Sequence, residues 1–563
     1  MDVRKLFSGV ARAISPRPFG GGAGASGEDA RASEEVARAS EDSGLGLNGE
    51  GLNGTAGASC NVNPSYRVAR RNRNAADNPV DRSGNSAVMD STMAGTHIRD
   101  GYRNIPQIKR TIDVYRDLVV GSGMGAYADP ITFEFGWNLK KLPRELLLSM
   151  FDYALESDEV FSEWANEPSA CHVDGRLSFA DMIAMCITEN AQVGDAFIIP
   201  TYTRGLPMPL QLQLIERDQL DVCKDRPATR GQNAIINGIE FDESGREIGA
   251  WFYDVHPHDD TGYGAGTFRS TFIRADRYWH LFRMTRPSQW IGATWLHAMG
   301  QPTRDRDKFL AAELRTAIKA ALFLLYAKRK NAGGDGLGLI PDLPCDPGDI
   351  ALGTNPIAAD MLPDEDVKLV ESARPNASAG AFFDLIDHDS AAATNLSYYS
   401  LTGRFERTNY TGFRGALQLE DAQITPVQNW LARQLVLPIR RRFNELAIAL
   451  GLMTTAGPAD LKRYPRRYRR FDVIGPGRNL IDPDKENEAA MGMIRGGLST
   501  LKIECARRGL HWIHVLRQIY LENLITDELG IVLDHSKGQG GQSGKNSRSG
   551  DEEKEQEEEA HAA

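Results

Sequence analysis

At 563 residues, the chain exceeds the usual size of one hydrophobic core and predicts about three or four domains or subdomains. Its 41% hydrophobic and 25% charged residues are ordinary for a soluble globular protein, and no apolar run approaches the ~20 residues of a membrane span. The net charge of −11 excludes a tight sequence-specific DNA binder more readily than a DNA channel, because lysine–phosphate contacts must break whenever a duplex slides along a wall.

Both ends of the chain have low sequence complexity. We expect residues 1–95 to be disordered, because their first half is rich in Gly, Ala, Ser and Glu. Residues 536–563 form an acidic tail, interpreted as solvated rather than as a docking peptide. The N-terminus lacks the apolar core of a signal peptide, and the six cysteines show no C-x-x-C pairing. We therefore expect neither export, nor a disulfide framework, nor a zinc site.

The first predicted helix starts near Ile105, where Ile108, Ile112 and Tyr115 recur at helical spacing. It is followed by Gly121-Ser122-Gly123-Met124-Gly125. A dinucleotide-binding loop is excluded, because residue 126 is Ala where the G-x-G-x-x-G fingerprint needs Gly, and because the loop follows a helix instead of a strand. The glycines are interpreted as a helix stop.

Residues 130–285 mix helix and strand signals. The clearest are a helix over Phe179–Ile187, a buried strand over Ala196–Pro200 and a half-exposed, alternating strand over Leu210–Ile215. The run 235–242, a turn at Glu243–Arg246 and the run Ala250–Tyr253 predict a hairpin.

The second half of the chain carries the strongest helical patterns. An apolar stripe over 304–330 predicts a long helix, and the following glycines break it. Residues 335–372 are rich in Pro, Gly and Asp and predict a small β-containing module, after which 380–401 predicts another helix. A long amphipathic helix then opens near Tyr410, and its prolines, Pro426 and Pro438, are expected to kink or split it.

Three groups of residues suggest chemistry, and each has a simpler interpretation. His256-Pro257-His258-Asp259-Asp260 carries metal-ligand types, but no second cluster offers itself to complete a site, so we favour a strand-to-loop exit. Cys171-His172 lacks a third group to orient the base of a thiol nucleophile. Ser543-Gly544-Lys545-Asn546 lacks the first glycine and the Ser/Thr of a Walker A loop.

One stretch is strongly basic and aromatic. Its charged residues are Lys462, Arg463, Arg466, Arg467, Arg469 and Arg470. Arginines interleaved with tyrosines can contact phosphates and stack on bases. We favour the alternative, an interface between subunits in which these residues pair with acidic neighbours.

Three motifs in order point to a family. Asn409-Tyr410-Thr411 with Arg414 opens the long helix, Gly475-Pro476-Gly477-Arg478 follows, and Ile481-Asp482-Pro483-Asp484-Lys485-Glu486 comes next. This order and spacing resemble the portal proteins of tailed bacteriophages, in the lambda-like branch. The resemblance covers roughly residues 105–530. It departs from the family pattern at Gln289-Trp290-Ile291-Gly292, which lacks the usual arginine, and at Arg508-Gly509-Leu510-His511.

The resemblance implies an α+β, portal-type fold with a mixed α/β wing, two stem helices, a small β-containing clip, a long channel helix and a helical C-terminal crown. Its expected divisions are a wing over 96–303, a stem helix over 304–331, a clip over 332–375, a second stem helix over 376–402, a tunnel loop over 403–413, a channel helix with the rest of the wing over 414–484, and a crown over 485–535.

The resemblance also implies a structural role without enzymatic activity or cofactor. It suggests a cyclic homo-oligomer, a dodecamer of about twelve copies, at one vertex of a virion capsid and in the host cytoplasm during assembly. The implied partners are the terminase large subunit, the major capsid protein, a head-completion adaptor and the double-stranded DNA passing through the ring during packaging and ejection. Sequence alone does not separate an infectious phage from a gene-transfer particle or a defective prophage.

In portals the loop before the channel helix lines the narrowest part of the channel. The resemblance therefore makes the candidate DNA contacts Arg404, Phe405, Arg407, Thr408, Asn409 and Tyr410. An ordinary helix–helix connection is the competing interpretation. The competing function for the whole chain is a metal- or acid/base-dependent hydrolase that uses His256, His258 and Asp259.

Overall fold

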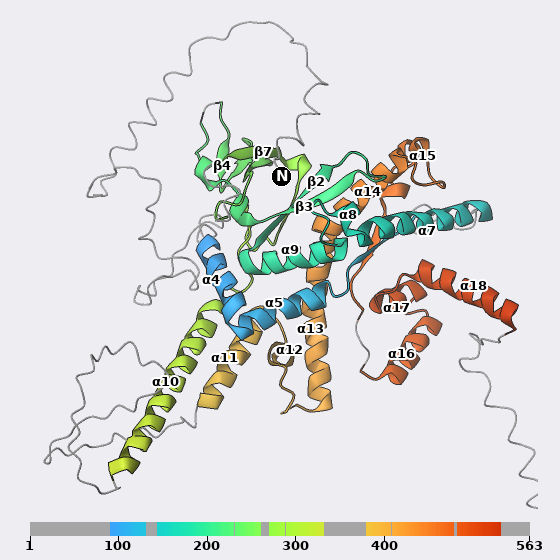
Figure 1. Ribbon diagram of the computed structural model, residues 1–563. Coiled ribbons are helices and arrows are strands. Elements are labelled where there is room, and N and C mark those ends of the chain that lie inside the picture. Colours follow the sequence, from blue (N-terminus) through green and yellow to red (C-terminus); the bar gives the residue numbers. More distant parts are fainter. Residues whose placement is uncertain are drawn as a thin grey trace, which may run out of the picture.

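The computed structural model describes residues 91–130, 143–229, 231–259, 269–287, 289–330, 379–406, 408–477 and 481–530. The expected clip and acidic tail lie outside these residues, as does the N-terminal segment before residue 91. Within the described ranges, no helix combines the length and the apolar character that a membrane crossing requires. The architecture is α+β, with antiparallel sheets and long helices (Figure 1).

Helix α4 (Ser91–Asn104) precedes the first helix that the sequence predicts, α5 (Pro106–Val119). The expected disorder up to residue 95 is therefore wrong at its C-terminal end. Buried Ala94 and Ile98 of α4 share a core cluster with Ile108 and Ile112 of α5. This apolar packing against α5 extends the ordered chain N-terminal to the predicted start near Ile105.

A three-stranded antiparallel sheet lies at the centre of the first half of the chain, in the order β3-β2-β8. Its strands are β2 (Asp195–Tyr202), β3 (Leu210–Ile215) and β8 (Trp279–Phe282). Helix α9 (Phe179–Val193) leads into β2 and begins with a capping box between Ser178 and Asp181. The expectation that β3 is half exposed is wrong at Gln211, which is buried and donates to the carbonyls of Ser169 and His172.

A second, four-stranded antiparallel sheet has the order β4-β5-β6-β7. Its strands are β4 (Ala234–Ile236), β5 (Ile239–Phe241), β6 (Glu247–Tyr253) and β7 (Ser270–Arg274). The predicted hairpin is confirmed as β5 and β6. Strands β4 and β5 form a further hairpin. Asn237 and Gly238 connect them with positive φ values of 52° and 76°, which suit a tight two-residue turn.

A two-stranded sheet joins distant parts of the chain. Strand β1 (Gly125–Ala128) pairs antiparallel with β9 (Phe471–Ile474). The predicted helix stop is confirmed by the positive φ values of Gly121 and Gly123, but the glycine segment continues into a strand that the sequence did not predict. This pairing brings the start of the folded chain beside its C-terminal third.

Two helices leave the body side by side. They are α10 (Gly300–Lys330) and α11 (Ala379–Thr394), and Figure 1 shows them projecting in the same direction. The Phe309 ring of α10 packs edge-on against Phe382 and Phe383 of α11. The single helix expected over 376–402 is wrong, because the chain breaks at Asn395, with φ 57°, before the short α12 (Tyr398–Thr402).

The long helix comprises α13 (Tyr410–Leu431), the π-helical segment η6 (Ala432–Val436) and α14 (Leu437–Ala449). The chain stays helical through Pro426 and is not split before Pro438. Because proline cannot donate the usual backbone hydrogen bond, the wider π turn ahead of Pro438 accommodates it. The buried side of this helix, including Leu435, Ile439 and Phe443, contributes to the largest core cluster.

The remaining helices surround this core. They are α7 (Arg144–Asn166), α8 (Pro168–Cys171), α15 (Pro458–Arg463), α16 (Pro483–Arg495), α17 (Leu501–Arg507) and α18 (Trp512–Leu529). Short helical turns are η3 (Arg217–Gln219), η4 (Val222–Lys224), η5 (Ala275–Arg277) and η7 (Arg467–Arg469). Helices α16, α17 and α18 form a group beside the body in Figure 1.

Candidate functional site

The loop between α12 and α13 is fixed at both ends by helix caps. Gly403 takes φ 69° at the end of α12, and its N–H donates to the Tyr399 carbonyl at 2.8 Å. Oδ1 of Asn409 accepts from the Gly412 N–H at 2.7 Å and so begins α13. The loop therefore holds a defined position between two helices while its middle faces outward.

Of the two aromatic residues among the candidate contacts, Phe405 packs against neighbouring rings and Tyr410 is exposed. The Phe405 ring lies 5.4 Å from Phe413 and 6.0 Å from Tyr399, although half of Phe405 stays exposed. Tyr410 is 55% exposed at the first turn of α13. The hydroxyl of Thr408 donates to the Asn409 carbonyl at 3.3 Å, so it serves the local turn.

The positive charge of Arg404 in this loop is paired only through one exposed contact. Nη1 of Arg404 lies 3.4 Å from Oδ1 of Asp384 on α11, and the Arg404 side chain is 54% exposed. An ion pair this exposed contributes little to stability and exchanges readily with another anion. Arg407 lies outside the described residues.

The basic stretch is mostly exposed, as an interface or a phosphate-binding surface requires. Nε of Arg469 pairs with Glu445 at 2.7 Å. The guanidinium groups of Arg463 and Arg467 lie 5.2 and 4.5 Å from the centre of the Tyr464 ring. Four arginines and two carboxylates border a hollow of about 580 Å³, formed by Arg441, Glu445, Arg466, Arg469, Arg470, Phe471 and Asp472. The pair of Arg469 and Glu445 shows that this surface already joins opposite charges.

The loop and the basic stretch do not form one site. One helical run from Tyr410 to Ala449 separates them. At ~1.5 Å per residue that run spans about 60 Å. In Figure 1 the loop lies at the free end of α13 and α15 lies beyond the other end of the run. A single bound group cannot touch both.

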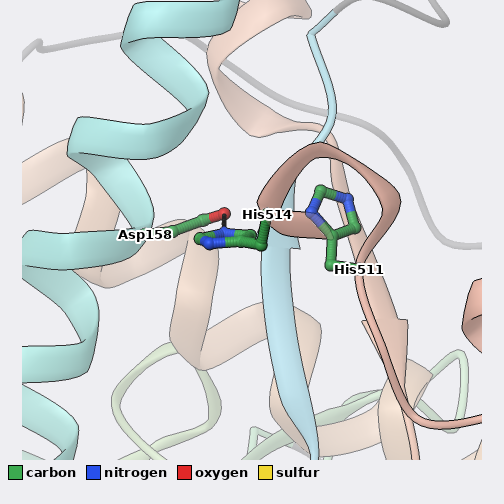
Figure 2. A group of neighbouring side chains, drawn as sticks. All are labelled: Asp158, His511 and His514. Carbon is green, nitrogen blue, oxygen red and sulfur yellow. Dashed lines mark hydrogen bonds and ion pairs between the residues drawn. The ribbon is translucent and has the colours of Figure 1, made fainter. Parts of the chain in front are cut away.

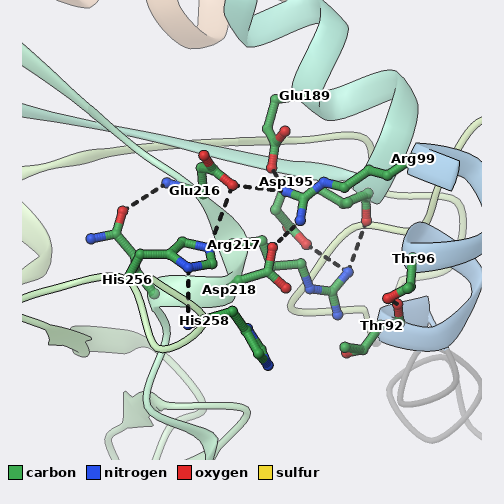
Figure 3. A network of polar contacts seen from close by, with 12 residues as sticks. Thr92, Thr96, Arg99, Glu189, Asp195, Glu216, Arg217, Asp218, His256 and His258 are labelled. Atoms are coloured by element: carbon green, nitrogen blue, oxygen red, sulfur yellow. Dashed lines mark hydrogen bonds and ion pairs between the residues drawn. The ribbon is translucent and has the colours of Figure 1, made fainter. Parts of the chain in front are cut away.

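The histidine turn at 256–258 acquires partners that the sequence did not predict. Glu216 and Asp218 bring carboxylates close to His256, whose Nε2 lies 3.7 Å from Glu216 Oε2 (Figure 3). Nδ1 of the same ring accepts from the His258 N–H at 3.1 Å. The expectation that no other ligand-type residues lie near the 256–260 segment is therefore wrong, because Glu216 and Asp218 do.

An arginine supplies the positive charge of this acidic group. The guanidinium of Arg99 bonds to Glu189 and Asp218 and lies 3.3 Å from Glu216 Oε2 (Figure 3). Burial raises the pKa of Glu189 to about 7, although Arg99 opposes that shift. The arrangement is a structural ion-pair network that ties α4 to α9 and η3.

The Cys171-His172 pair is structural too. The Cys171 thiol is buried and donates weakly to the carbonyls of Ala165 and Leu177. Burial raises its pKa to about 11, so the thiolate needed for nucleophilic attack is scarce at neutral pH. Nδ1 of His172 accepts from the Arg176 N–H instead of facing the sulfur.

The two motifs after the long helix form junctions. A Cβ on Gly477 would lie 2.2 Å from the Arg508 carbonyl, so only glycine allows this approach between the 475–477 segment and the α17–α18 turn. Pro483 occupies the first turn of α16, and Lys485 pairs with Asp482 at 2.8 Å, which lowers the pKa of Asp482. These residues position the C-terminal helices.

The sequence matches the family model described as "Phage portal protein, lambda family" over residues 70–428, well over half of the chain. Among individual proteins, portal protein B of Escherichia phage lambda is 20% identical over 478 residues, covering 79% of this chain and 86% of the relative. The portal protein of Escherichia phage N15 is 20% identical over 479 residues, covering 79% and 87%.

Solved structures with a likeness to this chain include a chain in the neck of an empty gene transfer agent (GTA) particle. It is 12% identical, has a TM-score of 0.33 and covers 74% of this chain and 93% of its own. A chain in the virion of a native gene transfer agent particle is 12% identical with a TM-score of 0.34, covering 74% and 92%. TM-scores this low do not bear on how the domains are arranged.

Proposed function

This chain belongs to the lambda family of phage portal proteins, and from that premise we propose that it forms a closed ring at one capsid vertex through which double-stranded DNA passes. The family match over residues 70–428 carries the proposal. The portal family is structural, not enzymatic. The net charge of −11 fits this role, because a wall that holds phosphates weakly lets a duplex slide.

We propose a ring of about twelve copies, closed by heterologous contacts between neighbouring subunits. In that ring α10 and the pair α11–α12 are the stem, and the run from α13 to α14 is the channel helix. The wing is 96–303 together with the part of 414–484 that follows the channel helix, and 485–535 is the crown. The parallel projection of α10 and α11 from the body supports the stem assignment (Figure 1).

The loop between α12 and α13 is the proposed tunnel loop. Arg404 and Arg407 touch passing phosphates without holding them, because a partly exposed arginine exchanges its carboxylate partner at little cost. Phe405 anchors the loop on α13 through Phe413, so that it moves with the channel helix.

The basic stretch on α15 and η7 is proposed as a surface between neighbouring subunits. One of its arginines, Arg469, already pairs with Glu445 within the chain, which supports charge pairing with another protein over sliding contact with DNA. A charge reversal, Arg466→Glu, is expected to weaken ring assembly and leave the isolated subunit folded. Unchanged rings would contradict this assignment.

The ring would dock the terminase large subunit, which supplies the ATP chemistry, and would contact the major capsid protein and a head-completion adaptor. It would belong to the virion and, during assembly, to the host cytoplasm. The hydrolase alternative has lost its main support, because Arg99 bonds to the carboxylates beside His256 that a catalytic ion would need.

Electron microscopy of the purified full-length protein by negative stain, with native mass spectrometry, tests the ring. We expect closed rings with a central hole wide enough for a ~20 Å duplex. Monomers or dimers across a range of salt concentrations would contradict the proposal.

The tunnel loop is tested with Arg404→Ala in a DNA-packaging assay that contains the cognate capsid and terminase. We expect intact rings and reduced packaging. The matched control is Arg103→Ala, another exposed arginine, on α4. Equal packaging by both variants would leave the loop an ordinary helix connection.

A further inference from the structure

Two histidines and an aspartate converge where the C-terminal helices meet the body. Asp158 comes from α7, and His511 and His514 come from the start of α18 (Figure 2). Their spacing of three residues places both histidines on one face of the helix start. One ligand atom from each of the three residues lies within 4.8 Å of the others, and His514 Nε2 lies 2.9 Å from Asp158 Oδ2.

The Asp158 carboxylate is held rigidly through one of its oxygens. Oδ1 accepts from the Ala128 N–H at 2.8 Å and from Nη2 of Arg440 at 3.1 Å. Oδ2 is left to face His514. Donors that fix one oxygen and present the other are the usual support of a metal-ligating carboxylate.

His511 provides the second, independent observation. Its side chain is only 3% exposed, and neither ring nitrogen has a hydrogen-bond partner among the described residues. The ring is stacked on Tyr127, with centroids 4.6 Å apart and planes within 2°. Figure 2 shows one ring nitrogen turned toward His514 and Asp158. A buried imidazole without partners is costly unless something binds it.

Because the buried His511 ring receives no hydrogen bond among the described residues, a ring nitrogen keeps its lone pair for a bound cation. Neutral imidazole is the common histidine ligand of transition metals. If His514 ligates through Nε2, its ring hydrogen lies on Nδ1.

We propose that Asp158, His511 and His514 bind a divalent transition-metal ion of the zinc class. Two imidazoles and one carboxylate suit such an ion, whereas magnesium and calcium prefer oxygen ligands. A hollow of about 840 Å³, bordered by Tyr127, Asp158 and His514, provides a route for entry and room for a water ligand. The ion would clamp α18 to α7.

The full-length protein is titrated with Zn²⁺ in a chelator competition and with Co²⁺ as an absorbing probe. Wild type is expected to bind one Co²⁺ per chain with the visible absorption of nitrogen and oxygen ligands. His511→Gln and His514→Gln should each weaken binding by more than roughly 100-fold, because loss of a supporting partner alone costs roughly 10–100-fold. Zn²⁺ should raise the melting temperature of wild type but of neither variant.

The matched control is His258→Gln, an exposed histidine of the 256–258 turn, which should bind like wild type. If His511→Gln does not fold, His514→Gln still decides, because His514 is partly exposed and Gln can keep the bond to Asp158. Wild-type affinity in His514→Gln would overturn the proposal. So would loss of binding in His256→Gln, or no Co²⁺ absorption in wild type.

Discussion

Two clusters in this molecule combine histidine and carboxylate ligands at metal-binding distance. One gathers Glu216, Asp218 and His256, and the other gathers Asp158, His511 and His514. Each cluster also includes an arginine, Arg99 in the first and Arg440 in the second. Residue types alone would assign both clusters the same chemistry.

The two clusters differ in the groups to which their arginine bonds. Arg99 bonds to carboxylates of the first cluster directly and takes the place that a cation would occupy. Arg440 bonds to one oxygen of Asp158 and otherwise to the backbone carbonyls of Ala126 and Ser157 and the Ser157 hydroxyl. The second cluster therefore keeps one carboxylate oxygen and two imidazoles available. A cluster of histidine and carboxylate side chains can therefore bind a metal ion only where no arginine already bonds to the carboxylate oxygens that the ion needs.

The largest expected effect is at Arg440, which is fully buried. Arg440→Met leaves the Asp158 carboxylate buried without its cation and should lower the free energy of unfolding by about 3–5 kcal/mol. Urea unfolding, followed by fluorescence, measures this. Arg442→Met, at an exposed arginine two residues further on, should cost less than about 1 kcal/mol. Equal losses would show that the Asp158 pair is not the cause.

Removal of Arg99 should make the first cluster able to bind a metal ion, as is proposed for the second. Arg99→Ala leaves Glu189, Glu216 and Asp218 without their countercharge and should cost about 2–3 kcal/mol. Mn²⁺ should then raise the melting temperature of the variant but not of wild type. Arg103→Ala, one turn later on α4, is the control. A variant indifferent to Mn²⁺ would contradict the view that Arg99 stands in for an ion.

Glu189, which bonds to Arg99 beside the first cluster, should also make stability depend on pH. Burial raises the pKa of Glu189 from 4.5 to about 7, so between these pH values the folded state holds a proton that the unfolded state has released. This contribution is present below about pH 4.5 and lost as pH rises through about 7, a loss on the order of 3 kcal/mol.

Glu189→Gln should remove that part of the pH dependence, as measured by urea unfolding at several pH values. Glu163→Gln, at an exposed position on α7, should retain the wild-type profile. Identical profiles for the two variants would mean that Glu189 stays ionised in the folded protein.

The smallest expected effect is at the exposed pair of Arg404 and Asp384. Arg404→Ala should change the free energy of unfolding by less than about 0.5 kcal/mol, because water screens both groups. A thermal unfolding comparison with wild type measures it. A loss above about 1 kcal/mol would show that Arg404 is structural, and its role in a tunnel loop would need another argument.

Local signals predicted the helices well. The apolar spacing of Ile108, Ile112 and Tyr115 gave α5, and the stripe over 304–330 gave α10, because such periodicity depends only on neighbouring residues. The break at Asn395 and the extra helix α4 were missed. Both depend on contacts with other elements, which outweigh weak local preferences. The Asn237-Gly238 turn between β4 and β5, in contrast, follows from a local pair of residues that favour positive φ.

The sequence by itself determined the family, because the family model matches residues 70–428 from the order of the amino acids alone. It also determined where the long helices run. Only the tertiary structure decided which side chains meet in the two histidine–carboxylate clusters. Asp158 and His514 lie 356 residues apart, and β1 pairs with β9 across a similar distance. Which arginine bonds to which carboxylate depends on how those distant segments pack, and no spacing along the chain records it.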